Sequence, residues 1–277
     1  MPETPERSPI AQAPLSAILV AFNGGPELEE VIAAWDAYFI SLTRSYEILL
    51  VNDASADDTE CRAGKLTEVM PHLRVLSHEQ HLGTGAALRT GLLAARYPLV
   101  LTVPCDKQYQ PPDLYRVLEA IDQVDLVAGY RIGTLPVGVR IWDFCGRVLA
   151  RVMLGASLEP RGCWPGWTGW RRRWLARWLF GVRVQDPECP YRLYRREVLQ
   201  RLRIQCNSSV AQIEILAKAN HLECVMAEVP VSWVPTKNAI LDSTDQKSSQ
   251  ELRHLFFAPD FGTERQLPSG DSAAILR

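Results

Sequence analysis

The sequence lacks the patterns that mark several large classes of protein. Its seven cysteines are scattered along 277 residues without a Cys-x-x-Cys pair, which argues against a disulfide framework and against a zinc site. No stretch reaches the ~18 apolar residues that a membrane-spanning helix needs, and no signal peptide is recognisable at the start. The net charge of −2 excludes little by itself, and we expect no nucleic-acid partner. These absences favour a cytoplasmic protein that is soluble or attached to a membrane surface.

Positive charge and tryptophan are concentrated in one segment. Residues 131–183 contain ten arginines and two acidic residues, a net charge of +8, which favours an anionic partner nearby. Within this segment five tryptophans recur every three or four residues from Trp164 to Trp178, so a helix would carry them on one face. Such a face fits a membrane interface, and it fits packing on a protein core equally well. Two similar segments that both end in glycine, 147–155 and 173–181, predict an amphipathic α-hairpin.

Short apolar runs alternate with amphipathic stretches through the first half of the chain. The runs cover residues 15–22, 46–51, 73–77, 99–103 and 124–130. This alternation predicts an α/β fold with a mostly parallel, Rossmann-like sheet between helices.

The composition of the remaining segments sets the expected domain limits. We expect one domain over 15–235, with a helical insertion at about 139–181. A closing strand over 223–234 contains a proline, which suggests a sheet edge. A disordered leader over 1–14 and a polar, partly disordered tail over 236–277 flank the domain.

Polar residues and glycines follow the carboxyl ends of the second, third and fourth predicted strands, where open α/β sheets bind ligands. Asp53 offers a carboxylate to a base or ribose, or equally a cap to the next helix. Asp106 and Gln108 offer oxygen ligands that suit Mg²⁺ or Mn²⁺, although a solvated turn has the same short pattern. The turn from Gly83 to Gly85 lets backbone N–H groups approach phosphates, but it lacks the spacing of a P-loop.

Taken together and in order, these motifs resemble those of the inverting family 2 glycosyltransferases, and within them the dolichyl- and polyprenyl-phosphate sugar synthases. The matching segments are 20–23 (VAFN), 51–59 (VNDASADDT), 83–91 (GTGAALRTG), 104–111 (PCDKQYQP), Gly129 with Arg131, 186–199 (DPECPYRLYRREVL) and 228–231 (EVPV). The resemblance extends over about residues 15–235, and so many ordered motifs argue against a chance match.

The resemblance implies a GT-A fold and the transfer of a sugar from a UDP- or GDP-linked donor. It assigns the nucleotide-sugar to Ala21, Asn23, Asp53, Ser55, Gly83, Gly85 and Arg89. It assigns a catalytic role to Asp106, which with Gln108 would bind Mg²⁺ or Mn²⁺. Contacts with the acceptor or the diphosphate fall to Arg131 and Arg192.

Two kinds of acceptor are compatible with this resemblance. A polyprenyl phosphate is already anionic and needs no general base, whereas a hydroxyl of a glycan needs a carboxylate, for which Asp186 and Glu214 are the candidates. Pro104 stands where the family has its first metal-site aspartate. This departure leaves two alternatives to a metal-dependent enzyme: a metal-independent transferase and a non-catalytic nucleotide-sugar binding module.

Overall fold

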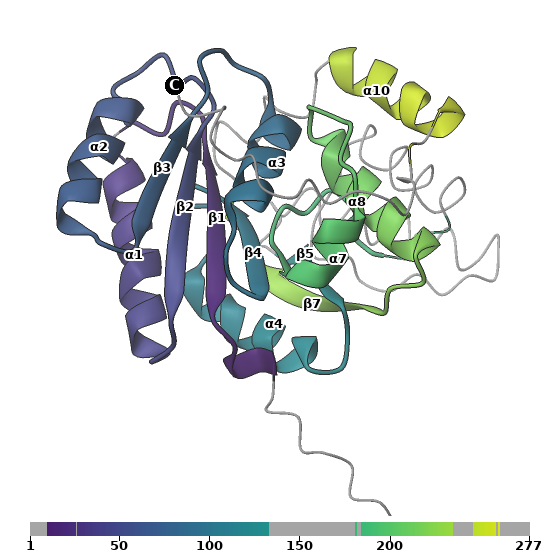
Figure 1. Cartoon of the computed structure of the whole chain (residues 1–277), viewed down its shortest axis with the longest axis horizontal. Coiled ribbons are helices and arrows are strands. Elements are labelled where there is room, and N and C mark those ends of the chain that lie inside the picture. Colours follow the sequence, from purple (N-terminus) through teal and green to yellow (C-terminus); the bar gives the residue numbers. More distant parts are fainter. Residues whose placement is uncertain are drawn as a thin grey trace, which may run out of the picture.

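The computed structural model describes residues 10–25, 27–132, 181, 184–234, 246–258 and 260, and these form a single seven-stranded sheet with helices on both faces (Figure 1). The strand order is β3-β2-β1-β4-β6-β5-β7. The strands are β1 (Leu15–Ala21), β2 (Tyr46–Asn52), β3 (Leu73–Ser77), β4 (Leu99–Pro104), β5 (Leu126–Ile132), β6 (Arg192–Arg195) and β7 (Met226–Ser232). Only β6 runs antiparallel to its neighbours, β4 and β5.

Helices cover the two faces of the sheet and separate the hydrophobic core into two parts. The helices are α1 (Glu27–Ser41), α2 (Thr59–Val69), α3 (Thr84–Ala94), α4 (Leu114–Ile121), α7 (Arg196–Arg201), α8 (Val210–His221) and α10 (Gln246–Phe257), with 3-10 turns η1 (Ile10–Gln12) and η2 (Pro111–Asp113). Alternate residues of β1 point to opposite faces, so Leu19 packs with α1 and α4 while Ile18 packs with α3 and α8. The two cores therefore complete a three-layer arrangement.

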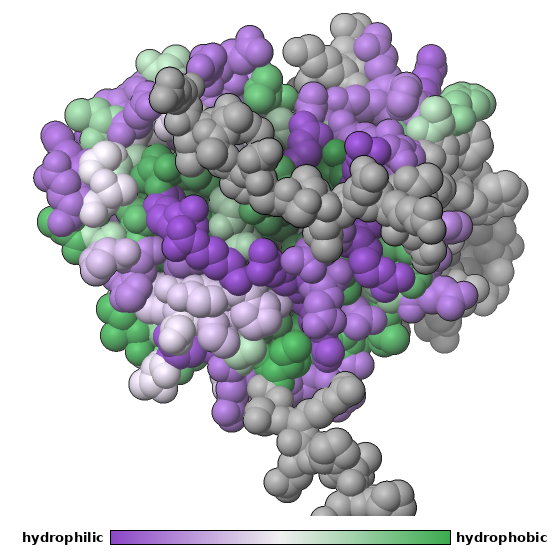
Figure 2. Space-filling view, viewed as in Figure 1, coloured by the Kyte–Doolittle hydropathy of each residue, from purple (hydrophilic) through white to green (hydrophobic). Residues whose placement is uncertain are grey.

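Burial explains why the central strands were recognisable from sequence. Every residue of β2 is buried, and β1 is buried at all positions but one, as expected for parallel strands that are covered on both faces. On the face seen in Figure 2, hydrophilic side chains predominate among the described residues and apolar ones form small patches. Within the described residues no helix is long and apolar enough to cross a membrane.

The five predicted strands and the mostly parallel sheet are confirmed. The predicted closing strand is β7, which lies at the sheet edge as its proline suggested. Antiparallel β6 was not predicted. Within the expected leader, Ile10–Gln12 form η1, and Ala11 N–H donates to Asp122 Oδ1. Helix α10 was not predicted within the polar tail. The expected α-hairpin and the Trp164–Trp178 face lie outside the described residues.

We predict that Gly91→Ala is destabilising although alanine is the better helix former. A Cβ at Gly91 would lie 2.4 Å from Cγ2 of Ile18, which is fully buried in β1. We expect this overpacking to lower the free energy of unfolding by about 1–3 kcal/mol in urea titrations. Gly64 in α2 is the matched control, because a Cβ there meets no atom within 4 Å. Gly64→Ala should raise the free energy by about 0.5–1 kcal/mol. Equal effects of the two substitutions would contradict the close contact between α3 and β1.

Candidate functional site

The candidate site lies at the carboxyl edge of the sheet, where the strand order reverses. From β1 the chain builds outward through β2 and β3 and then returns to place β4 on the other side of β1. Such a reversal is the usual ligand site of an open α/β sheet. The segments after β1 and β4 meet here, and Cys105 N–H donates to Val20 O at 2.8 Å.

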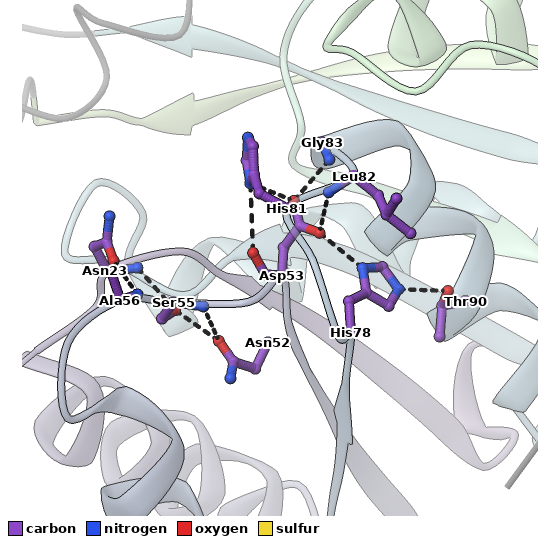
Figure 3. A network of polar contacts seen from close by, with 10 residues as sticks. All are labelled: Asn23, Asn52, Asp53, Ser55, Ala56, His78, His81, Leu82, Gly83 and Thr90. Atoms are coloured by element: carbon purple, nitrogen blue, oxygen red, sulfur yellow. Dashed lines mark hydrogen bonds and ion pairs between the residues drawn. The ribbon is translucent and has the colours of Figure 1, made fainter. Parts of the chain in front are cut away.

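The loops that follow β1 and β2 are tied together by Asn23 and Ser55. Asn23 N–H donates to Ser55 Oγ at 2.9 Å, and Asn23 Oδ1 accepts from Ala56 N–H at 2.9 Å (Figure 3). Ser55 Oγ in turn donates to Asn52 Oδ1 at 2.6 Å. Asn23 and Ser55, which were predicted to bind the nucleotide-sugar, therefore hold the two loops together. Ala21, predicted to bind it as well, is the buried last residue of β1.

Asp53 is the centre of this edge. Its carboxylate is enclosed by four donors: His78 Nδ1 at 2.7 Å and Leu82 N–H at 3.0 Å on Oδ1, and Gly83 N–H at 2.8 Å and His81 Nδ1 at 2.9 Å on Oδ2 (Figure 3). The side chain is only 2% exposed. Asp53 therefore holds the loop before α3. In this conformation both oxygens are engaged by the protein, and the contact of Asp53 with a nucleotide-sugar stays a prediction.

Hydrogen bonds also control the ionisation of Asp53. Burial alone would raise the pKa of this carboxyl, but the hydrogen bonds from His78, Leu82 and Gly83 and the charge of His81 outweigh burial and hold the pKa below its ordinary value. Asp53 is therefore ionised at neutral pH and stabilises the folded state there.

Asp53→Asn should lower the free energy of unfolding by about 1–3 kcal/mol at pH 7, because it removes a charged acceptor from buried donors. The folded pKa is depressed, so the contribution of the carboxylate is present above the unfolded pKa of about 4 and is lost as the pH falls through the folded pKa. Urea titrations from pH 7 to pH 3 should show the difference between wild type and variant shrinking. Asp58→Asn is the control, because its pair with Arg62 is exposed and should contribute about 0–1 kcal/mol. A difference that grows on acidification would contradict this assignment.

The glycine turn packs against protein. Gly83 has a φ of +105°, and a Cβ there would lie 2.5 Å from Asn207 O; a Cβ at Gly85 would lie 2.4 Å from Cys206 O. Gly85 N–H donates to Asn207 O at 2.7 Å, and Arg89 donates to Asn207 Oδ1 at 2.7 Å. The segment 204–208 therefore occupies the space in which a phosphate was expected. Gly83, Gly85 and Arg89, which were predicted to bind the nucleotide-sugar, make contacts within the chain in this structure.

Asp106 and Gln108 contact each other after β4. Gln108 N–H donates to Asp106 Oδ1 at 3.0 Å, and Gln108 Nε2 donates to Asp106 Oδ2. The amide oxygen of Gln108 accepts from Trp233 Nε1 at 2.9 Å, so the side chain that orients Asp106 is itself held in place. Its role as a metal ligand stays a prediction, because an amide oxygen has a second lone pair beyond the one that Trp233 uses.

Asp106 itself fits a cation. Burial, aided by the charge of Glu27, raises the pKa of Asp106 against the lowering effect of the Gln108 hydrogen bonds, and a nearby cation would favour its ionised form. Across the part of the chain that the structure describes, no group of three or more His, Cys, Asp or Glu residues is placed to hold a metal.

Arg131 and Asp186, which the sequence singled out separately, form a bidentate ion pair. Arg131 Nε and Nη2 lie 2.6 and 2.9 Å from the two carboxylate oxygens, and the guanidinium lies 5.6 Å from the ring centre of Trp233. Burial alone would lower the pKa of Arg131, but the charge and hydrogen bonds of Asp186 raise it. Asp186 is thus a poor proton acceptor while the pair is intact.

Arg192 and Glu214 lie in the interior. Arg192 is fully buried and donates to Cys189 O, Gln212 O and Pro187 O, so it braces the turn before β6 against α8. Its predicted contact with an acceptor or diphosphate is wrong. Glu214 is also fully buried and pairs with Lys218 at 2.6 Å.

Glu214 is held by the backbone as well as by Lys218. It accepts the N–H groups of Gln205 and Cys206, each at 2.8 Å. The expectation that it faces the site or solvent is wrong, and it has no place as a general base. Glu214 instead anchors the segment 204–208, on which the glycine turn rests.

Breaking the Glu214–Lys218 pair should affect stability strongly. Glu214→Gln or Lys218→Met alone leaves one buried charge without its partner and should lower the free energy of unfolding by about 3–5 kcal/mol. The double variant should lose less than the sum of the two single variants, measured by a urea double-mutant cycle. Strict additivity would show that the two side chains do not depend on each other.

Residues 16–203 match the model of the family described as Glycosyl transferase family 2, which is well over half of the chain. The chain is a family 2 glycosyltransferase. This match agrees with the resemblance drawn from the motifs.

Several relatives of the transferase have names that refer to a polyprenol or a polyprenyl phosphate. It is 29% identical over 219 residues to a polyprenol monophosphomannose synthase of Mycolicibacterium smegmatis, covering 76% of this chain and 73% of the relative. It is 24% identical to a dolichyl-phosphate beta-glucosyltransferase of Dictyostelium discoideum, covering 85% and 71%. A dodecaprenyl-phosphate galacturonate synthase of Rhizobium johnstonii is 29% identical, with 56% of this chain and 47% of that protein covered.

Solved structures confirm the GT-A fold. Glucosyl-3-phosphoglycerate synthase of Mycobacterium tuberculosis superposes with a TM-score of 0.59 at 21% identity, covering 88% of this chain and 80% of that one. The same enzyme in complex with Mn²⁺, UDP-glucose and phosphoglyceric acid gives a TM-score of 0.57 at 20% identity, covering 90% and 82%. At this level of identity the likeness carries the fold alone.

Proposed function

We propose that the transferase moves a sugar from a nucleoside diphosphate sugar to a polyprenyl phosphate. The observation that carries this choice is the state of the two candidate bases. Asp186 is tied to Arg131 by two hydrogen bonds, and Glu214 is buried against Lys218. A hydroxyl acceptor needs a carboxylate that takes its proton, whereas a phosphate oxygen is already ionised at neutral pH. The names of the relatives support the same acceptor class.

The reaction is a single displacement with inversion at the anomeric carbon. A phosphate oxygen of the acceptor forms the new bond to this carbon while the bond to the nucleoside diphosphate breaks, and the electron pair of that bond leaves with the diphosphate. We propose that Arg131 holds the acceptor phosphate through Nη1, since Asp186 engages Nε and Nη2. The ring of Trp233 packs against the guanidinium of Arg131 and helps to hold it in place.

We propose that Asp106 holds Mg²⁺ or Mn²⁺ together with oxygens of the donor diphosphate. Such a cation would supply positive charge that stabilises the leaving diphosphate. The residues of this chain have their own tasks: Asp106 provides the carboxylate, and Gln108 orients it through two hydrogen bonds. Because the acceptor is a lipid, we also expect the transferase to work at a membrane surface.

The full chain should form a polyprenyl-phosphate sugar when supplied with UDP- or GDP-sugars, polyprenyl phosphate and Mn²⁺. Asp106→Asn should lower kcat by about 10²-fold or more, because a charge at the leaving group is lost. Arg131→Ala should mainly raise KM for the lipid. Arg116→Ala is the matched control, because Arg116 is an exposed arginine on α4 that also pairs with an aspartate.

Three results would contradict this proposal. Transfer to a glycan hydroxyl or to 3-phosphoglycerate in place of the lipid phosphate would give a different acceptor. Donor binding without turnover toward any acceptor would support a binding module. Full activity in EDTA, unchanged by Asp106→Asn, would support a metal-independent transferase.

A further inference from the structure

Two exposed aromatic rings lie against each other at the carboxyl edge of the sheet. Phe22 follows β1 directly and is 47% exposed, and the side chain of His81, in the loop before α3, is 54% exposed. Their ring centroids are 4.2 Å apart with an interplanar angle of 34°. A phenylalanine with half its surface exposed beside a ligand-binding edge offers a flat apolar platform, and His81 covers part of it.

His81 also occupies one of the four donor positions around Asp53. Its Nδ1 lies 2.9 Å from Asp53 Oδ2, and Figure 3 shows its ring standing outward from the carboxylate. The other donors are fixed in the fold: the backbone N–H groups of Leu82 and Gly83, and His78, which is also bound to Thr90 Oγ1 at 2.8 Å. His81 is thus the one exposed side chain among the four donors.

A nucleobase meets the same two requirements as the His81 imidazole. It is a flat ring that can stack on an aromatic side chain, and uracil and guanine each carry a ring N–H that can donate to a carboxylate. Adenine and cytosine carry no ring N–H at neutral pH. The exposed position of His81 lets its side chain rotate outward without moving the backbone N–H groups that bind Asp53.

We propose that His81 is a placeholder for the nucleobase: its ring fills the base position when no donor is bound and swings out when the donor binds. The base then stacks on Phe22 and donates its ring N–H to Asp53 Oδ2. This inference rests on the proposed nucleotide-sugar donor, and it adds a specificity for uridine and guanosine nucleotides. It also accounts for the full set of partners around Asp53, which would otherwise leave no acceptor for a base.

The direction in which His81→Ala changes the Kd for nucleotides tests the placeholder. Calorimetric titration of the full chain with UDP, GDP, ADP and CDP in the presence of Mg²⁺ gives the dissociation constants. His81→Ala removes the competing ring and should lower the Kd for UDP or GDP by about 3- to 10-fold. In the His81→Ala background, where no ring competes for the platform, the further substitution Phe22→Ala should raise the Kd by about 10-fold. Gln80→Ala, an exposed neighbour of His81 without a contact to Asp53, is the control and should leave Kd within about 2-fold.

The imidazole provides a second measurement. The His81 ring protons, assigned by comparison with His81→Ala, should lose the ring-current shift from Phe22 when UDP or GDP is added. Tighter binding in His81→Ala together with this loss supports the placeholder. A higher Kd in His81→Ala overturns it, because His81 would then contact the nucleotide. An unchanged His81 signal at saturation also overturns it, because the ring would then stay in place.

The same titrations separate this inference from the proposed function. Nucleotide binding with the expected signs but no sugar transfer would leave the placeholder standing and contradict the enzyme activity. Sugar transfer together with weaker nucleotide binding in His81→Ala would support the enzyme activity and contradict the placeholder. Absence of binding of all four nucleotides to wild type and His81→Ala alike overturns both.

Discussion

The carboxylate of Asp53 fixes the functional edge of this transferase. A buried carboxylate is costly unless it is fully hydrogen bonded, so the end of β2 and the loop before α3 are constrained to bring four donors to it. One of these donors is Gly83 N–H, whose backbone needs a positive φ. The position of Gly83 sets the start of α3, so that Gly85 packs against the backbone of Cys206. The segment around Cys206 is in turn held by hydrogen bonds to Glu214. A chain of contacts thus runs from the edge of the sheet into the core.

Acidic groups at this edge differ in the partners that the same chain gives them. Asp53 is surrounded by donors, and Asp186 is matched by Arg131. Asp106 has only neutral donors from Gln108, and the pKa of its carboxyl is raised by burial. Trp233 connects the two halves of this arrangement, because its Nε1 binds Gln108 while its ring faces Arg131. A cation that arrives with the donor would therefore be stabilised most at Asp106. This position lies near Trp233, whose ring also faces Arg131.

The sequence predicted the parts of the fold that depend on local pattern. The central strands were recognisable because parallel strands covered on both faces are continuous apolar runs, as in β2. Antiparallel β6 was missed because it is four residues long and begins with the fully buried Arg192. Arg192 and Glu214 were taken for site residues because polarity along a sequence does not show which charges find partners inside the fold. The Arg131–Asp186 pair joins residues 55 positions apart, and neither His78 nor Trp233 belonged to a recognised motif.

The placeholder changes how much of the binding free energy comes from the base of a nucleotide donor and how much from its diphosphate. Without His81, the donor-free protein would expose Phe22 further and leave one position on Asp53 to water. With His81 in place, entry of a base exchanges one stacked ring for another and one N–H donor for another, so the exchange gains little in stacking or hydrogen bonding. Most of the affinity must then come from the diphosphate end, near Asp106 and the cation proposed there. The base end contributes chiefly discrimination, because a base without a suitably placed N–H displaces His81 and leaves Asp53 short of a donor.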